Sequence, residues 1–260
     1  MENLSTTLKS VPEKKPNECV IATINIRTLS NDIKLGSTYD IFKSLRHDIC
    51  CYQETKRTGQ GILQHDDTQF IWSGHKRKKS EGVGIMLSKN VKLIDISYIN
   101  ERILNILVKV NNIKTSITNC YAPTNCANDN KKDLFYRNLQ KCIDSTPKQY
   151  KNIIIGDFNA TIGEESFGFW QCLGPTNNKM ETNNNGHRLL KFSENNNMRL
   201  ENSIRPSTKG EKRINTWVSP TGFEKRLDYI LTSQFIHKYV NKFIVRPGSS
   251  EAYETDHLLL

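Results

Sequence analysis

The chain has 260 residues, of which 36% are hydrophobic and 25% charged, with seven cysteines and a formal net charge of +10. This length suits a single α/β or two-sheet domain with a sizeable core, and the basic balance favours a polyanionic partner. The cysteines are odd in number and show no C-x-x-C spacing, which argues against a disulfide framework or a zinc site. The sequence shows neither the apolar core of a signal peptide nor an apolar run long enough to span a membrane. We therefore expect an intracellular protein without a membrane partner, with the nucleus as a possible location.

The first segment of the chain is polar and contains Pro12 and Pro16. We therefore expect residues 1–18 to form a disordered leader, followed by one domain over residues 19–260. The run that follows the leader is alternating and β-branched, which predicts a strand ending at Asn25.

The next segments alternate between helix and strand patterns. Apolar residues on one helical face predict a helix over 38–47, and a strand over Ile49–Gln53 is expected to present Glu54 at its end. Two further strands, Gln69–Ser73 and Gly82–Ser88, are predicted to form a hairpin with a basic tip. Four cations of this tip are expected to contact DNA phosphates: Lys76, Arg77, Lys78 and Lys79. A plain solvent-exposed turn explains the same charges about equally well.

The spacing of apolar residues, every second residue in strands and every three to four residues in helices, predicts the remaining elements. These are strands near 91–97, over 102–110 and over 113–121, a helix over 129–143, a strand ending at Asp157, a helix over 187–197, a strand before Trp217 and a strand over Leu227–Leu231. An asparagine-rich patch at 183–186 precedes the second of these helices. Its low complexity favours compositional drift over function.

In one stretch, Asn152–Gly163 with the sequence NIIIGDFNATIG, an apolar run is followed directly by side chains that can bind a metal or accept a proton. Its apolar run predicts a buried strand that stops at Asp157 and brings Asn159 to the same rim of a sheet. A strand followed by an Asx turn explains this pattern equally well when it is taken alone.

Similar polar residues recur where the predicted strands end: Asn25, Glu54, Tyr121, Asp157, Asn159, Asp228, Asp256 and His257. Strand ends at one edge of a sandwich converge on a single site. Carboxylate and amide oxygens suit Mg²⁺, with Mn²⁺ as an alternative, His257 can donate to a phosphate oxygen, and Asp157 can orient or deprotonate a water. Each residue has an ordinary structural explanation by itself, and only their joint occurrence favours phosphodiester hydrolysis.

The chain resembles the endonuclease/exonuclease/phosphatase superfamily in seven ordered segments: TINIRTL (23–29), YQET (52–55), NCYAPT (119–124), IGDFNATIG (155–163), TWVSPTG (216–222), RLDYIL (226–231) and TDH (255–257). Within it, the chain most resembles the apurinic-endonuclease-like domain of LINE-type non-LTR retrotransposons. The GDFNATIG stretch, the segment 183–192 and the spacing from TWVSPTG to LDYIL carry this finer resemblance. The phosphatase and sphingomyelinase branches share the acids and the final histidine but usually not those segments.

The resemblance implies an α/β, deoxyribonuclease I-like fold, a four-layer sandwich of two mixed β-sheets flanked by helices. It implies a role for each strand-end residue: Glu54 as main metal ligand, with Asn25 and Asp256 beside the metal, Tyr121 on the scissile phosphate, Asp157 aligning the attacking water, Asn159 holding the phosphate or that water, and His257 stabilising the transition-state charge while oriented by Asp228. In the family the last strand runs on beyond the residues that match Leu258–Leu260, so we expect this strand to be truncated.

The activity implied by the resemblance is that of a magnesium-dependent DNA endonuclease, which nicks one strand and leaves a 3′-hydroxyl suited to prime reverse transcription. A monomer is expected, with a reverse transcriptase region as a partner in the parent element. Two alternatives stay open. One is another phosphatase or nuclease of the superfamily, and the other is a decayed or domesticated copy that binds nucleic acid or protein without catalysis.

Overall fold

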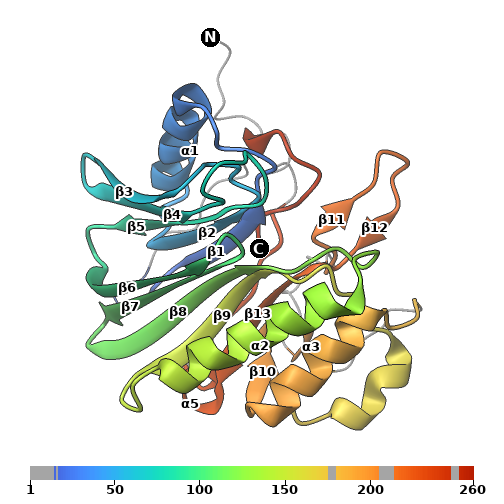
Figure 1. Cartoon of the computed structure of the whole chain (residues 1–260). Helices are drawn as coiled ribbons and strands as arrows, with labels where there is room; N and C mark the ends of the chain where they lie inside the picture. Colours follow the sequence, from blue (N-terminus) through green and yellow to red (C-terminus); the bar gives the residue numbers. More distant parts are fainter. Residues whose placement is uncertain (1–14, 16, 175–179, 205–213, 247–251) are drawn as a thin grey trace.

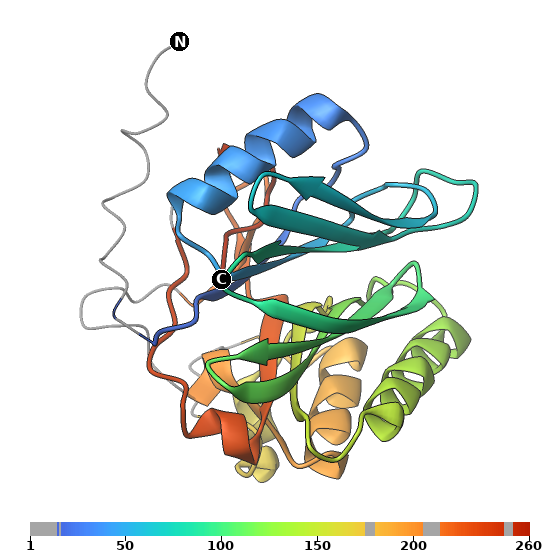
Figure 2. The same ribbon diagram turned by 90° about the vertical axis from the view of Figure 1, so that its left-hand side faces the viewer.

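The computed structural model describes residue 15 and residues 17–174, 180–204, 214–246 and 252–260. Two β-sheets stack face to face, with α1 on the outer face of one and α2 and α3 on the outer face of the other (Figures 1 and 2). This four-layer α/β sandwich confirms the predicted fold class. Nearly all of the expected leader falls outside the described residues.

The first sheet has five strands in the order β1-β2-β5-β4-β3. Its strands are β1 (Ile21–Asn25), β2 (Ile49–Gln53), β3 (Gln60–His65), β4 (Thr68–Ser73) and β5 (Val83–Ser88). β1 and β2 run parallel, whereas β4 and β5 form the predicted antiparallel hairpin. Sequence periodicity missed β3, because its side chains are mostly exposed and show no alternation.

The second sheet has six strands in the order β10-β13-β9-β8-β7-β6. Its strands are β6 (Lys92–Asn100), β7 (Ile103–Val110), β8 (Ile113–Tyr121), β9 (Lys151–Asp157), β10 (Met198–Leu200) and β13 (Asp228–Ser233). β8 and β9 are parallel, and β13 lies antiparallel to β9 with Asp228 opposite Asp157. A small separate hairpin pairs β11 (Trp217–Val218) with β12 (Glu224–Lys225). The strand expected before Trp217 lies mostly outside the described residues.

The helices begin where asparagine side chains cap them. In α1 (Asp32–Ser44), α2 (Asp129–Ser145) and α3 (Asn184–Asn195), the preceding asparagine accepts a backbone N–H of the first turn. The predicted bounds 38–47 and 187–197 were therefore wrong at their starts, since both caps lie before them. Three short helical segments complete the part of the fold that the structure describes: η1 (Glu164–Phe169), α4 (Glu201–Ile204) and α5 (Gln234–His237).

Alternation along the strands divides the core into layers. In β9, Ile153 and Ile155 pack between the two sheets, whereas Ile154 packs beneath α2 and α3. Within this apolar interior, Gln53 Nε2 donates to Asn119 Oδ1 at 2.7 Å, and Asn119 Nδ2 donates to the Gly84 carbonyl on β5 at 2.7 Å. Both amide side chains are fully buried, so these bonds fix the relative position of the sheets directly below the ends of β2 and β8.

The last residues of the chain lie against β1. Thr23 and Leu260 exchange two backbone hydrogen bonds of 2.8 and 3.0 Å, and Leu258 and Leu259 are buried. None of the seven cysteines forms a disulfide, and most of them are buried. Within the described residues, no helix combines the length and the apolar character needed to cross a membrane.

Candidate active site

Side chains from both sheets meet at one end of the sandwich, because the parallel pairs β1–β2 and β8–β9 end there. Asn25, Tyr121 and Asp157 are the last residues of their strands, Glu54 directly follows β2, and Asn159 comes two residues after Asp157. All of the predicted strand-end residues except Asp228 line one cleft of about 490 Å³. A larger cavity of about 630 Å³ lies at the other end of the sandwich, is lined mainly by aliphatic side chains and contains none of them.

Glu54 connects the two sheets within the cleft. Its Oε1 accepts hydrogen bonds from Asn25 Nδ2 at 2.9 Å and from the Tyr121 hydroxyl at 2.8 Å. Its Oε2 lies 3.7 Å from Lys56 Nζ, and the side chain is 24% exposed. One carboxylate oxygen is thus fixed by neutral donors, while the other is left to interact with a cation.

Asp157 is almost fully buried at the bottom of the cleft. Its Oδ2 accepts from Asn25 Nδ2 at 3.0 Å and its Oδ1 accepts from the Asn159 backbone N–H at 2.8 Å. Burial and then the nearby charge of Asp228 raise the pKa of Asp157 to about 7, against the opposing effects of His257 and of its hydrogen bonds. A carboxylate with such a pKa can accept a proton near neutral pH.

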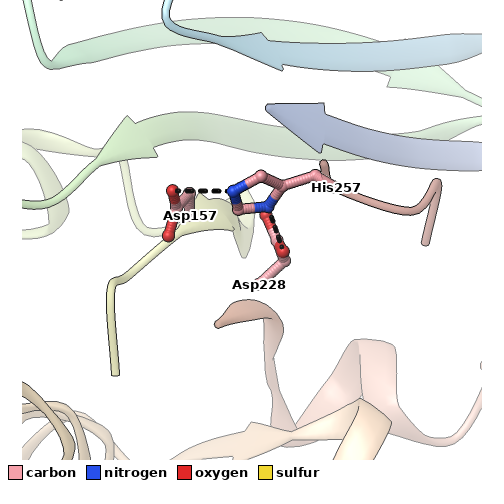
Figure 3. Close-up of side chains that lie close together, drawn as sticks. All are labelled: Asp157, Asp228 and His257. Atoms are coloured by element: carbon pink, nitrogen blue, oxygen red, sulfur yellow. Dashed lines mark hydrogen bonds and ion pairs between the residues drawn. The ribbon is translucent and has the colours of Figure 1, made fainter. Parts of the chain in front are cut away.

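His257 lies between two carboxylates, as Figure 3 shows. Its Nδ1 is 3.0 Å from Asp228 Oδ2, and its Nε2 is 3.9 Å from Asp157 Oδ2. Burial lowers the pKa of His257, but the charge and hydrogen bond of Asp228, with smaller effects of Asp157 and Asp256, raise it to about 9. The imidazole is therefore held protonated and oriented, with Nε2–H on the side of Asp157.

The ligand atoms of Asp157, Asp228 and His257 all lie within 4.8 Å of one another, a spacing that could hold a metal. However, Asp228 and His257 already pair with each other, and both are buried. The oxygens of Glu54, Asn25 and Asp256 fit a hard divalent cation better, because these residues line the cleft and supply two carboxylates and an amide. Asp256 Oδ2 accepts from Trp217 Nε1 at 2.9 Å, which leaves its Oδ1 near Arg27 Nε at 3.4 Å.

The basic loop, which we define as Lys76, Arg77, Lys78 and Lys79, lies at the same end of the first sheet. Strand register places Val83 beside both Ser73 and Gln53, so this loop and Glu54 lie at the same end. Backbone bonds from Lys56 to Glu81 and from Gly59 to His75 tie the loop to the segment after Glu54. All four cations are exposed, and none lines the cleft.

Several residues of the cleft were not predicted as site residues from the sequence. Arg27, Lys56 and Lys225 bring positive charge to the cleft, and Trp217 forms part of its wall. Arg27 and Lys56 each lie two positions after a predicted site residue, which is a signal that could have been used. No periodicity or motif marks Lys225, whose Nζ lies 6.0 Å from the centre of the Trp217 ring.

Comparisons with known proteins agree with this geometry. Residues 22–257 match the sequence profile of the Endonuclease/Exonuclease/phosphatase family. Craniofacial development protein 2 of Bos taurus is 30% identical over 248 residues, which cover 94% of this chain but only 40% of that protein. The chain thus spans about two fifths of the length of this curated relative.

Two solved structures share the fold. The endonuclease domain of TRAS1, a telomere-specific non-LTR retrotransposon, superposes with a TM-score of 0.66 at 11% identity, covering 93% of this chain and 96% of that domain. The catalytic domain of APE2 from Xenopus laevis superposes with a TM-score of 0.65 at 18% identity, covering 92% and 89% of the two chains.

Proposed function

Because the chain belongs to the endonuclease/exonuclease/phosphatase family, we propose that it is a metal-dependent DNA endonuclease of the retrotransposon type, which nicks one strand and leaves a 3′-hydroxyl. The observation that carries this proposal is the placement of Asp157 against the His257–Asp228 pair, next to the hydrogen-bonded group of Asn25, Glu54 and Tyr121. A proton acceptor, a protonated imidazole and oxygen ligands for a cation then face one cleft.

The residues present fit a divalent metal. Glu54, with Asn25 and Asp256, would hold Mg²⁺ or Mn²⁺, which when bound neutralises negative charge on the phosphate. Glu54 Oε1 is already oriented by two donors, which is the kind of support that fixes a metal ligand.

The other side chains would handle the phosphate and its attacking water. Asp157 orients that water and accepts its proton as the water oxygen bonds to phosphorus. His257 donates from Nε2 to a phosphate oxygen, where negative charge grows in the transition state. Tyr121 and Asn159 contact the phosphate from the ends of β8 and β9. The bond between phosphorus and O3′ breaks, which leaves a 5′-phosphate, and the departing O3′ takes up a proton from solvent to give the 3′-hydroxyl.

DNA as the substrate is supported by charge and by similarity. The chain carries a net charge of +10, and its basic loop lies at the end of the sheet where the cleft opens. The TRAS1 domain, which shares the fold, is described as the endonuclease of a retrotransposon. The basic loop would bind phosphates away from the scissile bond, which sets the register of the duplex without reading its sequence.

A second candidate is a domesticated copy that binds nucleic acid or protein without catalysis. It is favoured by the curated relative, which is named as a development protein and is much longer than this chain.

A plasmid assay separates the two candidates. Wild-type protein with Mg²⁺ is expected to convert supercoiled plasmid to the nicked form, and Asp157→Ala to lower the rate by about two to four orders of magnitude. Asp40→Ala, which changes an exposed aspartate of α1 outside the cleft, is the matched control. Activity that persists in excess EDTA would contradict the metal-dependent reaction, and binding without nicking would favour the second candidate.

A further inference from the structure

Two loops leave the second sheet side by side at the cleft. Because β8 and β9 are parallel with Tyr121 opposite Asp157, the segments 122–128 and 158–163 begin next to each other. Within the second segment, Asn159 has a φ of 48°, in the left-handed region that costs a non-glycine residue conformational energy. Surrounding contacts must therefore hold this residue in place.

The contacts that hold Asn159 come partly from the asparagine-rich patch. The Asn159 carbonyl accepts from Asn183 Nδ2 at 3.1 Å and from Asn185 Nδ2 at 3.2 Å. Asn185 Nδ2 also donates to the Pro123 carbonyl at 2.8 Å, so one buried amide group connects both loops. The interpretation of this patch as compositional drift was wrong for these two residues.

Asparagine suits positions 183 and 185 because its side-chain N–H groups can donate to the backbone carbonyls of Asn159 and Pro123. Asn183 Oδ1 caps α3 by accepting from the Gly186 N–H at 2.7 Å, while its Nδ2 donates to Asn159. Asn185 Oδ1 is buried and finds no hydrogen-bond partner among the described residues. An unpaired buried acceptor is unfavourable, so the two bonds donated by the same side chain must outweigh that cost.

Asn159, which Asn183 and Asn185 hold, is in turn hydrogen-bonded to Asp157 and to Ala122. The Asn159 N–H donates to Asp157 Oδ1 at 2.8 Å, and Asn159 Nδ2 donates to the Ala122 carbonyl at 3.0 Å. The Ala122 N–H in turn donates to the Asp157 carbonyl at 2.8 Å. A shift of the Asn159 peptide would therefore rotate the Asp157 carboxylate.

We propose that Asn183 and Asn185 are positioning residues, which clamp the 122–128 and 158–163 segments and thereby set the direction of the Asp157 carboxylate. The importance of this clamp for catalysis rests on the proposed nuclease function. Asn184, between them, is exposed and instead accepts a bond from Arg188 on the same helix.

The test makes one chemical change at three consecutive positions: Asn183→Asp, Asn184→Asp and Asn185→Asp. Aspartate keeps the size of the side chain, replaces its N–H donors by an acceptor oxygen and adds one negative charge. It is also as good a helix cap as asparagine, so the Asn183 variant retains the start of α3. The Asn184 variant is the matched control, because it adds the same charge to the same turn without touching either loop.

The Asn185 variant is expected to lower kcat for plasmid nicking by about 10- to 100-fold, since displacing a supporting group by a fraction of an ångström misaligns the group it supports. We expect kcat to fall most in the Asn185 variant and less in the Asn183 variant, and to stay near the wild-type value in the Asn184 variant. KM for DNA should change little, and kcat is expressed per folded protein, because a loss of folded protein would also lower the apparent kcat at constant KM.

Hydrogen exchange gives a readout independent of activity. Backbone amides of the 122–128 and 157–163 segments should exchange faster in the Asn185 variant than in the Asn184 variant. Unchanged kcat in folded Asn183 and Asn185 variants, or exchange that accelerates only within α3, would overturn the proposal. If wild-type protein nicks no plasmid, the proposed function fails, and the exchange comparison alone still decides whether the clamp exists.

Discussion

Replacing Asp228 by asparagine removes one buried negative charge beside His257 and keeps the shape of the side chain. Asp228 is fully buried, and its Oδ2 lies 3.0 Å from His257 Nδ1. Burial by itself lowers the pKa of His257, and Asp228 is the largest influence that raises it, to about 9. After burial, Asp228 is also the largest cause of the raised pKa of Asp157, about 7.

The direction in which Asp228→Asn shifts the pH profile follows from the contribution of Asp228 to these two pKa values. In the proposed reaction the active form needs Asp157 deprotonated and His257 protonated, so we expect wild-type nicking to be fastest between about pH 7 and about pH 9. Without the negative charge of Asp228, the pKa of both groups falls, so both limits move to lower pH. The imidazole then becomes neutral at the wild-type optimum, and nicking there should fall by about two to four orders of magnitude.

The assay is the pH dependence of the nicking rate at saturating Mg²⁺. Glu201→Gln is the matched control, because Glu201 is another fully buried acid whose Oε1 lies 2.8 Å from a histidine nitrogen, that of His237, outside the cleft. Its pH profile should match that of the wild type. A profile for Asp228→Asn that keeps both wild-type limits, or an equal loss in the Glu201 variant, would refute the proposed roles of Asp157 and His257.

Three further predictions concern other parts of the chain. Glu54→Gln should raise the Mg²⁺ concentration for half-maximal nicking by about tenfold or more, and an unchanged metal titration would remove Glu54 from the metal site. Changing the basic loop to serines should reduce the slope of log affinity against log salt by about two to three with little effect on kcat, whereas an unchanged slope would mean plain solvent exposure. Burial, helped by the charge of Arg246, lowers the pKa of His47 from 6.5 to about 3, so its stabilising effect is present above 6.5 and is lost as pH falls. Wild-type unfolding free energy should then decrease by about 2 kcal/mol more than that of His47→Gln between about pH 7 and about pH 5, and parallel curves in denaturant melts would contradict this.

The sequence allowed the strand ends to be predicted because the strands have strong local signals. In β9, three isoleucines precede Asp157, and in β2 a run of buried residues precedes Glu54. Each such signal lies within a few residues of the functional side chain. Parallel pairing then brings the ends of β1 and β2 together in the first sheet and those of β8 and β9 together in the second, and the buried bond between Gln53 and Asn119 aligns the two sheets.

The residues that sequence reasoning missed act over long separations in the chain. Asn185 Nδ2 donates to the Pro123 carbonyl and Asn183 Nδ2 donates to the Asn159 carbonyl, bonds that depend on where α3 packs. Neither contact leaves a periodic pattern, because a buried amide that serves a carbonyl has the same composition as a surface loop. The repeated asparagines suggested low complexity, although one of them is fully buried and another is exposed.

The mixture of charges in the cleft links metal binding to DNA binding. Glu54 and Asp256 lie near Lys56 and Arg27, so each cation now faces an acid that the proposed metal would also need. A polyanion entering this cleft meets three carboxylates, those of Glu54, Asp157 and Asp256, and their repulsion opposes it. A divalent cation on Glu54 would offset that charge and leave Lys56 and Arg27 to pair with phosphates on either side of the scissile bond. Since coupling between two ligands is reciprocal, DNA must strengthen metal binding by the same factor by which the metal strengthens DNA binding.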